Sequence, residues 1–222
     1  MKSLSRILIV DDHPIMRQGL RQLIQLESDI EVCEEAASVP EAMEKIEEHN
    51  PDLVLADITM PGRNGLELVK DARAVNPSLQ ILVISMHDET IYAERVLKAG
   101  GRGYVMKDAG GEKILEAIKT VLTGNIYVSP QISSRILEIF SGAGNQGGQD
   151  PVTALSDREL EIFQLIGQGN ETKEIAAQLS ISPKTVEVHR LNIKSKLKIA
   201  TATELLRYAV RWIESNACPN EP

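Results

Sequence analysis

The sequence predicts an α/β fold, in which a doubly wound five-stranded parallel sheet is followed by a smaller all-α domain of four helices. Two observations carry the prediction. In the first part of the chain, short apolar runs alternate with amphipathic stretches, as in parallel sheets that helices cover on both faces. After a segment with four glycines between Gly142 and Gly148, the pattern is helical throughout. Because such glycine density makes a flexible linker, we place the domain boundary there.

The elements of the first part are predicted from their spacing. Strands are expected at Ile7–Val10, Ile30–Glu34, Leu53–Ala56, Ile81–Ile84 and Gly103–Met106. Helices are expected at Pro14–Leu26, Val39–Glu48, Gly65–Val75, Tyr92–Ala99 and Glu112–Leu122. The run at Ile30–Glu34 has polar positions, so we expect it near an edge of the sheet. Five strand–helix repeats fit a small doubly wound fold, in which ligands bind beyond the carboxyl ends of the strands.

The four helices of the second part are predicted from caps and periodicity. Ser156 and Glu159 form a capping box at the start of the first helix. Ser182 caps the third helix, and Pro183 suits its first position. The helices are expected at Ser156 to about Ile166, Thr172–Leu179, Pro183 to about Leu197 and about Thr203–Glu214, the last with Leu205, Leu206, Ala209, Val210 and Ile213 on one stripe.

Composition is that of an ordinary globular protein. Hydrophobic residues make up 42% of the chain and charged residues 25%. The apolar run near the N-terminus is too short for a signal peptide, and no later stretch is long enough to span a bilayer. We therefore expect a cytoplasmic protein without a membrane partner, in which Cys33 and Cys218 are reduced thiols.

The charge is distributed unevenly. Residues 1–152 contain 15 basic and 23 acidic residues and so carry the whole net charge of −8, whereas residues 153–222 contain nine of each. Within the second part, the segment from Lys184 to Lys198 has five basic residues and one acidic residue. An acidic chain does not suggest a nucleic-acid partner, but a basic strip inside a neutral half does so weakly.

Polar residues stand where the predicted strands end. Asp11 and Asp12 follow the first strand, Asp57 the third, Ser85 the fourth and Lys107 the fifth. The fold brings these side chains to one rim of the sheet. Three crowded carboxylates repel one another unless a cation neutralises them, and Mg²⁺ suits such oxygen ligands together with a phosphoryl group. A carboxylate can attack phosphorus while Mg²⁺ and a lysine stabilise the charge, so the rim has the parts for phosphoryl transfer.

Four motifs carry a resemblance to a known family. They are IVDDHP (Ile9–Pro14), LADITMPGRNG (Leu55–Gly65), ISMHD (Ile84–Asp88) and GYVMKD (Gly103–Asp108). These motifs resemble the receiver domain of two-component response regulators, which has a flavodoxin-like fold. The resemblance covers residues 6 to about 123, and it departs from many receivers in having Asp108 where they have proline.

The resemblance implies a role for each rim residue. Asp57 is implied as the phosphoacceptor, and Asp11, Asp12, Asp57 and the backbone carbonyl of Thr59 as the ligands of Mg²⁺. Lys107 is implied to contact the phosphoryl group, with Ser85 as a switch hydroxyl and Tyr104 as the aromatic residue that moves with it.

The third helix of the second part has one basic face. On a helical wheel, Val186, His189, Ile193 and Leu197 share the face that packs inward. The expected DNA-contacting residues are Lys184, Thr185, Glu187, Val188, Arg190, Leu191, Lys194 and Lys198. Lysines and Arg190 can contact phosphates, while Val188 or Leu191 can touch thymine methyl groups. Glu187 is an exception on this face, and it could accept a hydrogen bond from cytosine N4.

The run from Leu155 to Leu197 is similar to the LuxR-type DNA-binding domain. With the receiver motifs, the chain resembles response regulators of the NarL/FixJ type. This implies a receiver at residues 1–124, a linker at 125–152 with a helical start and a glycine-rich end, and a helix-turn-helix domain at 153–218. The implied partners are a histidine kinase, double-stranded DNA and a second copy of the chain, with RNA polymerase as a further candidate.

Alternatives stay open at this point. Phosphorylation could order a dimer or release a DNA-binding helix that the receiver covers. The helical domain could bind another protein instead of DNA, since the same motif occurs in interaction domains. A metal-dependent phosphatase of the same sheet architecture is a third hypothesis. If the chain is a receiver instead, we expect no enzyme activity beyond catalysis of its own phosphorylation and dephosphorylation.

Overall fold

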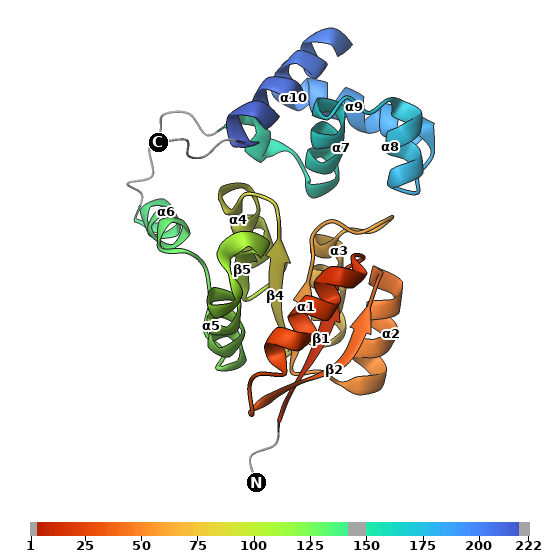
Figure 1. The fold of residues 1–222 in the computed structure, drawn as a ribbon. Helices are drawn as coiled ribbons and strands as arrows, with labels where there is room; N and C mark the ends of the chain where they lie inside the picture. The colour runs from red at the N-terminus through yellow and green to blue at the C-terminus, as the bar shows by residue number, and fades with distance from the viewer. Residues whose placement is uncertain (1–3, 142–149, 218–222) are drawn as a thin grey trace. The chain divides into compact units, whose positions relative to one another are not determined.

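The computed structural model describes residues 4–141 and 150–217 (Figure 1). The chain divides into two compact units, Met1–Gly144 and Asn145–Pro222. Residues 142–149, which contain the four clustered glycines, lie outside the described residues, and so does Cys218. None of the described helices is both long and apolar enough to cross a membrane.

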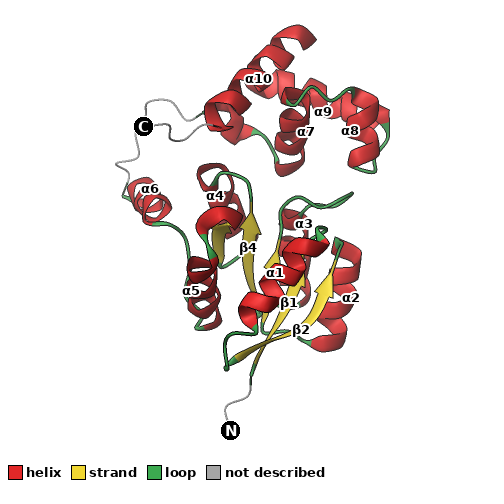
Figure 2. Cartoon of the chain, in the orientation of Figure 1, coloured by secondary structure: helices red, strands yellow, loops and turns green. Residues whose placement is uncertain are grey.

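The first unit is a five-stranded sheet with helices on both faces (Figure 2). Its strands run in parallel in the order β2-β1-β3-β4-β5, which confirms the predicted doubly wound fold and the edge position of β2. The strands are β1 (Ser5–Val10), β2 (Ile30–Ala36), β3 (Leu53–Ala56), β4 (Gln80–Ser85) and β5 (Gly103–Met106). The helices are α1 (Pro14–Ile24), α2 (Val39–His49), α3 (Gly65–Val75), α4 (Glu89–Ala99) and α5 (Gly111–Leu122), with a 3₁₀ turn η1 (Lys107–Ala109) before α5.

The core of this unit explains why consecutive residues of the central strands are apolar. Alternate residues of β1, such as Ile7 and Ile9, pack in one cluster with side chains of α1 and α5. The residues between them, Leu8 and Val10, are buried as well, because the sheet has helices on its other face too. Every peptide bond in the described parts of the chain is trans, the one before Asp108 included.

Two predicted helix bounds in the first unit were wrong by more than one residue. The helix expected at Tyr92 starts one turn earlier, at Glu89, because the Asp88 carboxylate accepts a hydrogen bond from the Thr90 amide at 2.7 Å and caps it. The helix expected to reach Leu26 ends at Ile24. The start at Glu89 matters for function, since α4 begins only four residues after Ser85.

A segment after α5 closes the β5 edge of the sheet. The Tyr127 backbone accepts a hydrogen bond from the Tyr104 amide at 2.9 Å and donates one to the Arg102 carbonyl at 3.0 Å. Helix α6 (Pro130–Phe140) follows and packs on α4, where Ile132 is buried. Two hydrogen bonds join these elements, from Ser129 to Glu89 at 2.5 Å and from Arg135 to the Thr90 carbonyl at 3.1 Å.

The second unit is helical, as predicted. Its elements are a 3₁₀ turn η2 (Pro151–Ala154) and the helices α7 (Asp157–Gly167), α8 (Thr172–Gln178), α9 (Pro183–Leu197) and α10 (Ala202–Ala217). The capping box of Ser156 and Glu159 is present, and Ser182 caps α9 by accepting from the Thr185 amide at 3.0 Å. The expected apolar stripe of α10 was wrong at Leu206, which is 42% exposed, because Trp212 packs inward against Phe163 instead.

Candidate functional site

Three rim residues meet in the first unit at a buried ion-pair cluster. Lys107 Nζ lies 2.7 Å from Asp11 Oδ2 and 2.8 Å from Asp57 Oδ2. Asp11 is 2% exposed and Asp57 4% exposed, so the lysine is paired with two carboxylates that water barely reaches. Asp12 lies on the more exposed side, where the His13 ring Nδ1 is 2.8 Å from its Oδ1.

The local sequence fixes the position of Asp57 tightly. Asp57 directly follows β3, and its amide donates to the Val10 carbonyl of β1 at 2.8 Å. The loop after it returns so closely that a Cβ on Gly65 would lie 2.0 Å from the Asp57 carbonyl oxygen. Asn64 is buried beside it and caps α3 by accepting from the Glu67 amide at 3.1 Å. Glycine is therefore required at position 65, and the carboxylate stands on a rigid support.

The ionisation of the cluster follows from burial and charge. Burial raises the pKa of Asp57 above its ordinary value, and the hydrogen bond and charge of Lys107 offset only part of this effect. Burial lowers the pKa of Lys107, but the hydrogen bonds and charges of Asp11 and Asp57 outweigh it and leave that pKa raised. The lysine is thus held in its charged form, while the Asp57 carboxylate binds a proton more readily than an exposed aspartate does.

The donor set fits a hard divalent cation. One ligand atom from each of Asp11, Asp12, His13 and Asp57 can lie within 4.8 Å of the others. Three carboxylates against one lysine leave the cluster negative, and Asp57 Oδ1 is buried without a hydrogen-bond partner among the described residues. An unpartnered buried carboxylate oxygen is a place where a bound cation or a phosphoryl group would restore the lost interaction. Sequence reasoning assigned no role to His13, although it directly follows the acidic pair.

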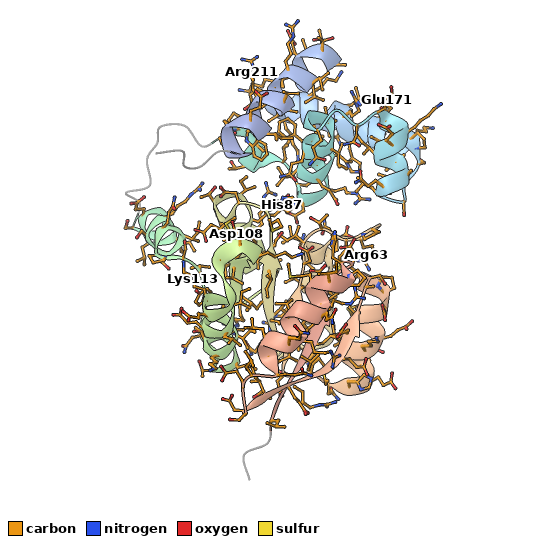
Figure 3. All side chains as sticks on the ribbon, in the orientation of Figure 1. Arg63, His87, Asp108, Lys113, Glu171 and Arg211 are labelled. Atoms are coloured by element: carbon orange, nitrogen blue, oxygen red, sulfur yellow. The ribbon has the colours of Figure 1, made fainter. Side chains whose placement is uncertain are left out.

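His87 contacts the two remaining rim residues, Ser85 and Tyr104, and sequence reasoning assigned it no role. Its amide donates to the Ser85 hydroxyl at 3.3 Å, and its carbonyl accepts from the Tyr104 hydroxyl at 2.6 Å. Figure 3 labels this residue. Its ring Nε2 lies 2.8 Å from Thr59 Oγ1, and the ring packs on Tyr92 of α4 with centroids 4.9 Å apart. Ser85 and Tyr104 are both buried. His87, in the turn between β4 and α4, therefore contacts two buried residues and also the loop after Asp57.

In the second unit, α9 presents the predicted face to solvent. Val186 and Ile193 are fully buried, and His189 is half-buried beside them. On the other face Lys184, Thr185 and Glu187 are exposed, and the apolar Val188 and Leu191 are 49% and 58% exposed. Arg190 and Lys194 are half-buried. Two apolar side chains exposed between basic ones are unusual for a surface helix and suit contacts with base edges.

Lys198 lies outside the helix whose wheel was used to place it, and its contact with DNA stays a prediction. Lys198 is the residue that ends α9, and its φ of 56° puts its backbone in the left-handed region. Its side chain direction therefore does not continue the helical face that Lys184 and Lys194 share.

Comparisons with known proteins agree with both halves of the fold. A model of the response regulator receiver domain matches residues 7–119, and a model of bacterial regulatory proteins of the luxR family matches residues 153–209. Oxygen regulatory protein NreC of Staphylococcus carnosus (strain TM300) is 36% identical over 210 residues, which cover 93% of this chain and 97% of that protein.

Solved structures of this kind are similar as well. A LuxR-family two-component response regulator from Aurantimonas sp. SI85-9A1 has a TM-score of 0.58 and 37% identity, covering 63% of this chain and 99% of that one. The RcsB response regulator of Salmonella typhimurium has a TM-score of 0.70 and 25% identity, covering 94% and 98% of the two chains. The chain therefore belongs to the two-component response regulators that join a receiver domain to a LuxR-type DNA-binding domain.

Proposed function

We propose that Asp57 is the phosphoacceptor and that its phosphorylation controls how the LuxR-type domain binds DNA. The observation that supports this most is the buried cluster itself, in which Lys107 bridges Asp11 and Asp57 while Asp57 Oδ1 has no hydrogen-bond partner in the part of the chain that the structure describes. A lone aspartate after a strand is usually a cap, but a carboxylate held by a buried lysine beside an unpartnered oxygen is arranged for group transfer.

The proposed metal ligands are Asp11, Asp12, Asp57 and the Thr59 carbonyl, and the proposed cofactor is Mg²⁺. When bound there, Mg²⁺ would supply positive charge to the phosphoryl oxygens. His13 stands beside the acidic pair and orients Asp12, so we assign it a supporting role rather than a ligand's role. A nitrogen ligand is less suited to Mg²⁺ than the carboxylate oxygens are.

The proposed step transfers a phosphoryl group from a histidine of the kinase to Asp57. Asp57 Oδ1 attacks phosphorus, the phosphorus–nitrogen bond breaks, and the imidazole leaves with the electron pair. Lys107 keeps its hydrogen bond to Asp11 and turns its second one from Asp57 Oδ2 to a phosphoryl oxygen. Water attack on the acyl phosphate later returns Asp57 to its carboxylate, so the domain acts only on itself.

The proposed signal passes through the β4–α4 turn. The Ser85 hydroxyl donates to the new phosphoryl group and thereby shifts the turn that contains His87. Because the His87 carbonyl accepts from Tyr104 and its ring packs on Tyr92, the shift reaches both β5 and α4. The result is a change in the population of two surface arrangements rather than a new fold.

The proposed DNA contacts lie on α9. Phosphates are contacted by the basic side chains of Lys184, Arg190, Lys194 and Lys198. Thr185 also contacts DNA. Val188 and Leu191 touch thymine methyl groups, and Glu187 accepts from cytosine N4. The Thr185 hydroxyl is 2.8 Å from that of Ser182, which places it at the start of the helix where a backbone phosphate would approach.

The assembly is proposed from relatives. The RcsB protein of Salmonella enterica serovar Typhimurium has been solved bound to a promoter with the phosphomimetic BeF3⁻, and two RcsB dimers have been solved on two parallel DNAs. By analogy we propose that this chain acts as a cytoplasmic homodimer on double-stranded DNA and that it contacts RNA polymerase. The proposed domain bounds are 1–124 for the receiver, 125–152 for the linker and 153–218 for the DNA-binding domain.

The test is DNA affinity with and without a phosphoryl mimic. Adding Mg²⁺ and beryllofluoride to the full chain should tighten binding to its operator about 5- to 150-fold, the usual range for coupling between two sites. The Asp57→Asn variant should keep the basal affinity and lose the response, because beryllofluoride needs the carboxylate. Equal affinities for the wild type in both conditions would rule out control by phosphorylation.

A further inference from the structure

Glu187 is an anionic side chain on the face that α9 would turn to DNA. Phosphate oxygens repel a carboxylate, so an unrestrained Glu187 would turn away from the groove and read no base. In the structure it is restrained from a second helix. The Thr172 hydroxyl, on the first residue of α8, lies 2.7 Å from Glu187 Oε1.

The same hydroxyl also holds the cation of this face. Arg190 Nη1 lies 3.1 Å from Thr172 Oγ1. A guanidinium can only donate, so the threonine oxygen accepts from Arg190. The hydroxyl proton of Thr172 is then free to be donated to Glu187. The three residues form a chain of two hydrogen bonds, in which Arg190 donates to Thr172 and Thr172 donates to Glu187.

The arrangement has two physical consequences. The Arg190 charge is one hydroxyl away from the carboxylate and partly compensates it, which reduces the repulsion from DNA. The hydroxyl also limits the rotamers of two long side chains before DNA arrives, so less conformational freedom is lost on binding. Only one oxygen of Glu187 is used by Thr172, and a carboxylate can accept several hydrogen bonds.

We propose that Thr172 is a positioning residue that sets the base preference of this regulator by holding Glu187 toward a base with an exocyclic amino group, cytosine above all. The inference rests on the proposed function, since it requires that α9 reads the major groove. Thr172 itself stands on α8 and touches no base. Its effect on base preference passes entirely through Glu187, while its effect on phosphate contacts is small because the lysines of α9 remain.

The test is a binding-site selection with the full chain in Mg²⁺ and beryllofluoride. Wild type is compared with Thr172→Val, which keeps the shape and removes the hydroxyl, and with Thr172→Ser, which restores it. We expect Thr172→Val to weaken discrimination at the base that Glu187 reads by about 3- to 10-fold, the worth of one hydrogen bond of this kind. Affinity for random DNA and its salt dependence should change less than about twofold.

A double-mutant cycle separates positioning from general damage. In a Glu187→Ala background, Thr172→Val should have no further effect on base preference. Thr172→Ser should select the wild-type sequence. If Thr172→Val selects the same sequence as wild type with equal discrimination, or acts equally with and without Glu187, the inference is overturned although the DNA-binding function stands. If the wild type itself selects no sequence, the proposed function fails and this inference fails with it.

Discussion

Replacing Lys107 by alanine should slow phosphorylation of Asp57 by a small phosphodonor about 100-fold or more. The lysine is the cation that the structure places within 2.8 Å of both Asp11 and Asp57, and its side chain is only 6% exposed. Removing one buried donor that meets developing negative charge typically lowers a rate by about 10²–10³. The measurement is the rate of acyl phosphate formation with acetyl phosphate in Mg²⁺.

The same variant should not lose Mg²⁺. Without the ammonium group, Asp11 and Asp57 face no competing cation, so calorimetry should give a Mg²⁺ affinity at least equal to that of the wild type. Lys113→Ala is the matched control, because Lys113 is an exposed lysine on α5 with no part in the cluster, and it should phosphorylate normally (Figure 3). A Lys107→Ala protein that phosphorylates at the wild-type rate would remove the lysine from the mechanism.

Replacing Gly65 by alanine should destabilise the first unit by about 3 kcal/mol and impair phosphorylation at the same time. A Cβ at this position would lie 2.0 Å from the Asp57 carbonyl oxygen and 2.9 Å from its carbonyl carbon, so either α3 or the phosphoacceptor must move. Overpacking against side chains costs about 1–3 kcal/mol, and backbone has less room to yield. Amide hydrogen exchange in β1 and β3 during urea titration would report this unit alone.

Gly19→Ala is the same chemical change as Gly65→Ala, but we expect it to change the stability of the first unit in the opposite direction. Gly19 lies within α1, and a Cβ there would meet nothing within 4 Å. Alanine is favoured over glycine inside a helix by about 0.8–1.0 kcal/mol, so this variant should be more stable than the wild type and phosphorylate at the same rate. If both variants change stability equally, the close approach at Gly65 does not matter.

The sequence predicted the fold and the rim because both follow from short-range patterns. In a parallel sheet, the residue after each strand lies at the same edge, and Asp11, Asp57 and Lys107 do meet there. Amphipathic spacing likewise identified the buried side of α9 at Val186 and Ile193. These features can be predicted from the order of residues within one helix or strand and from the parallel direction of the neighbouring strands.

The features that sequence reasoning missed depend on contacts between distant residues. His87 meets Thr59 and Tyr104 only because the sheet brings two loops and strand β5 together, and no periodicity marks it. Thr172 reaches Glu187 across the turn between α8 and α9, a contact that a wheel of either helix alone does not contain. Lys198 was placed on the DNA face because a wheel continues past the residue where the backbone leaves the helix.

The central claim is that the acidic cluster at the sheet rim uses a divalent cation to place one phosphoryl group on Asp57. It is tested most directly by incubating the full chain with acetyl phosphate, with Mg²⁺ or with EDTA, and mapping the modified peptide by mass spectrometry. We predict a single hydroxylamine-sensitive phosphoryl group on Asp57 in Mg²⁺, none in EDTA and none in Asp57→Asn. Labelling of a different residue, or equal labelling in EDTA, would contradict the account.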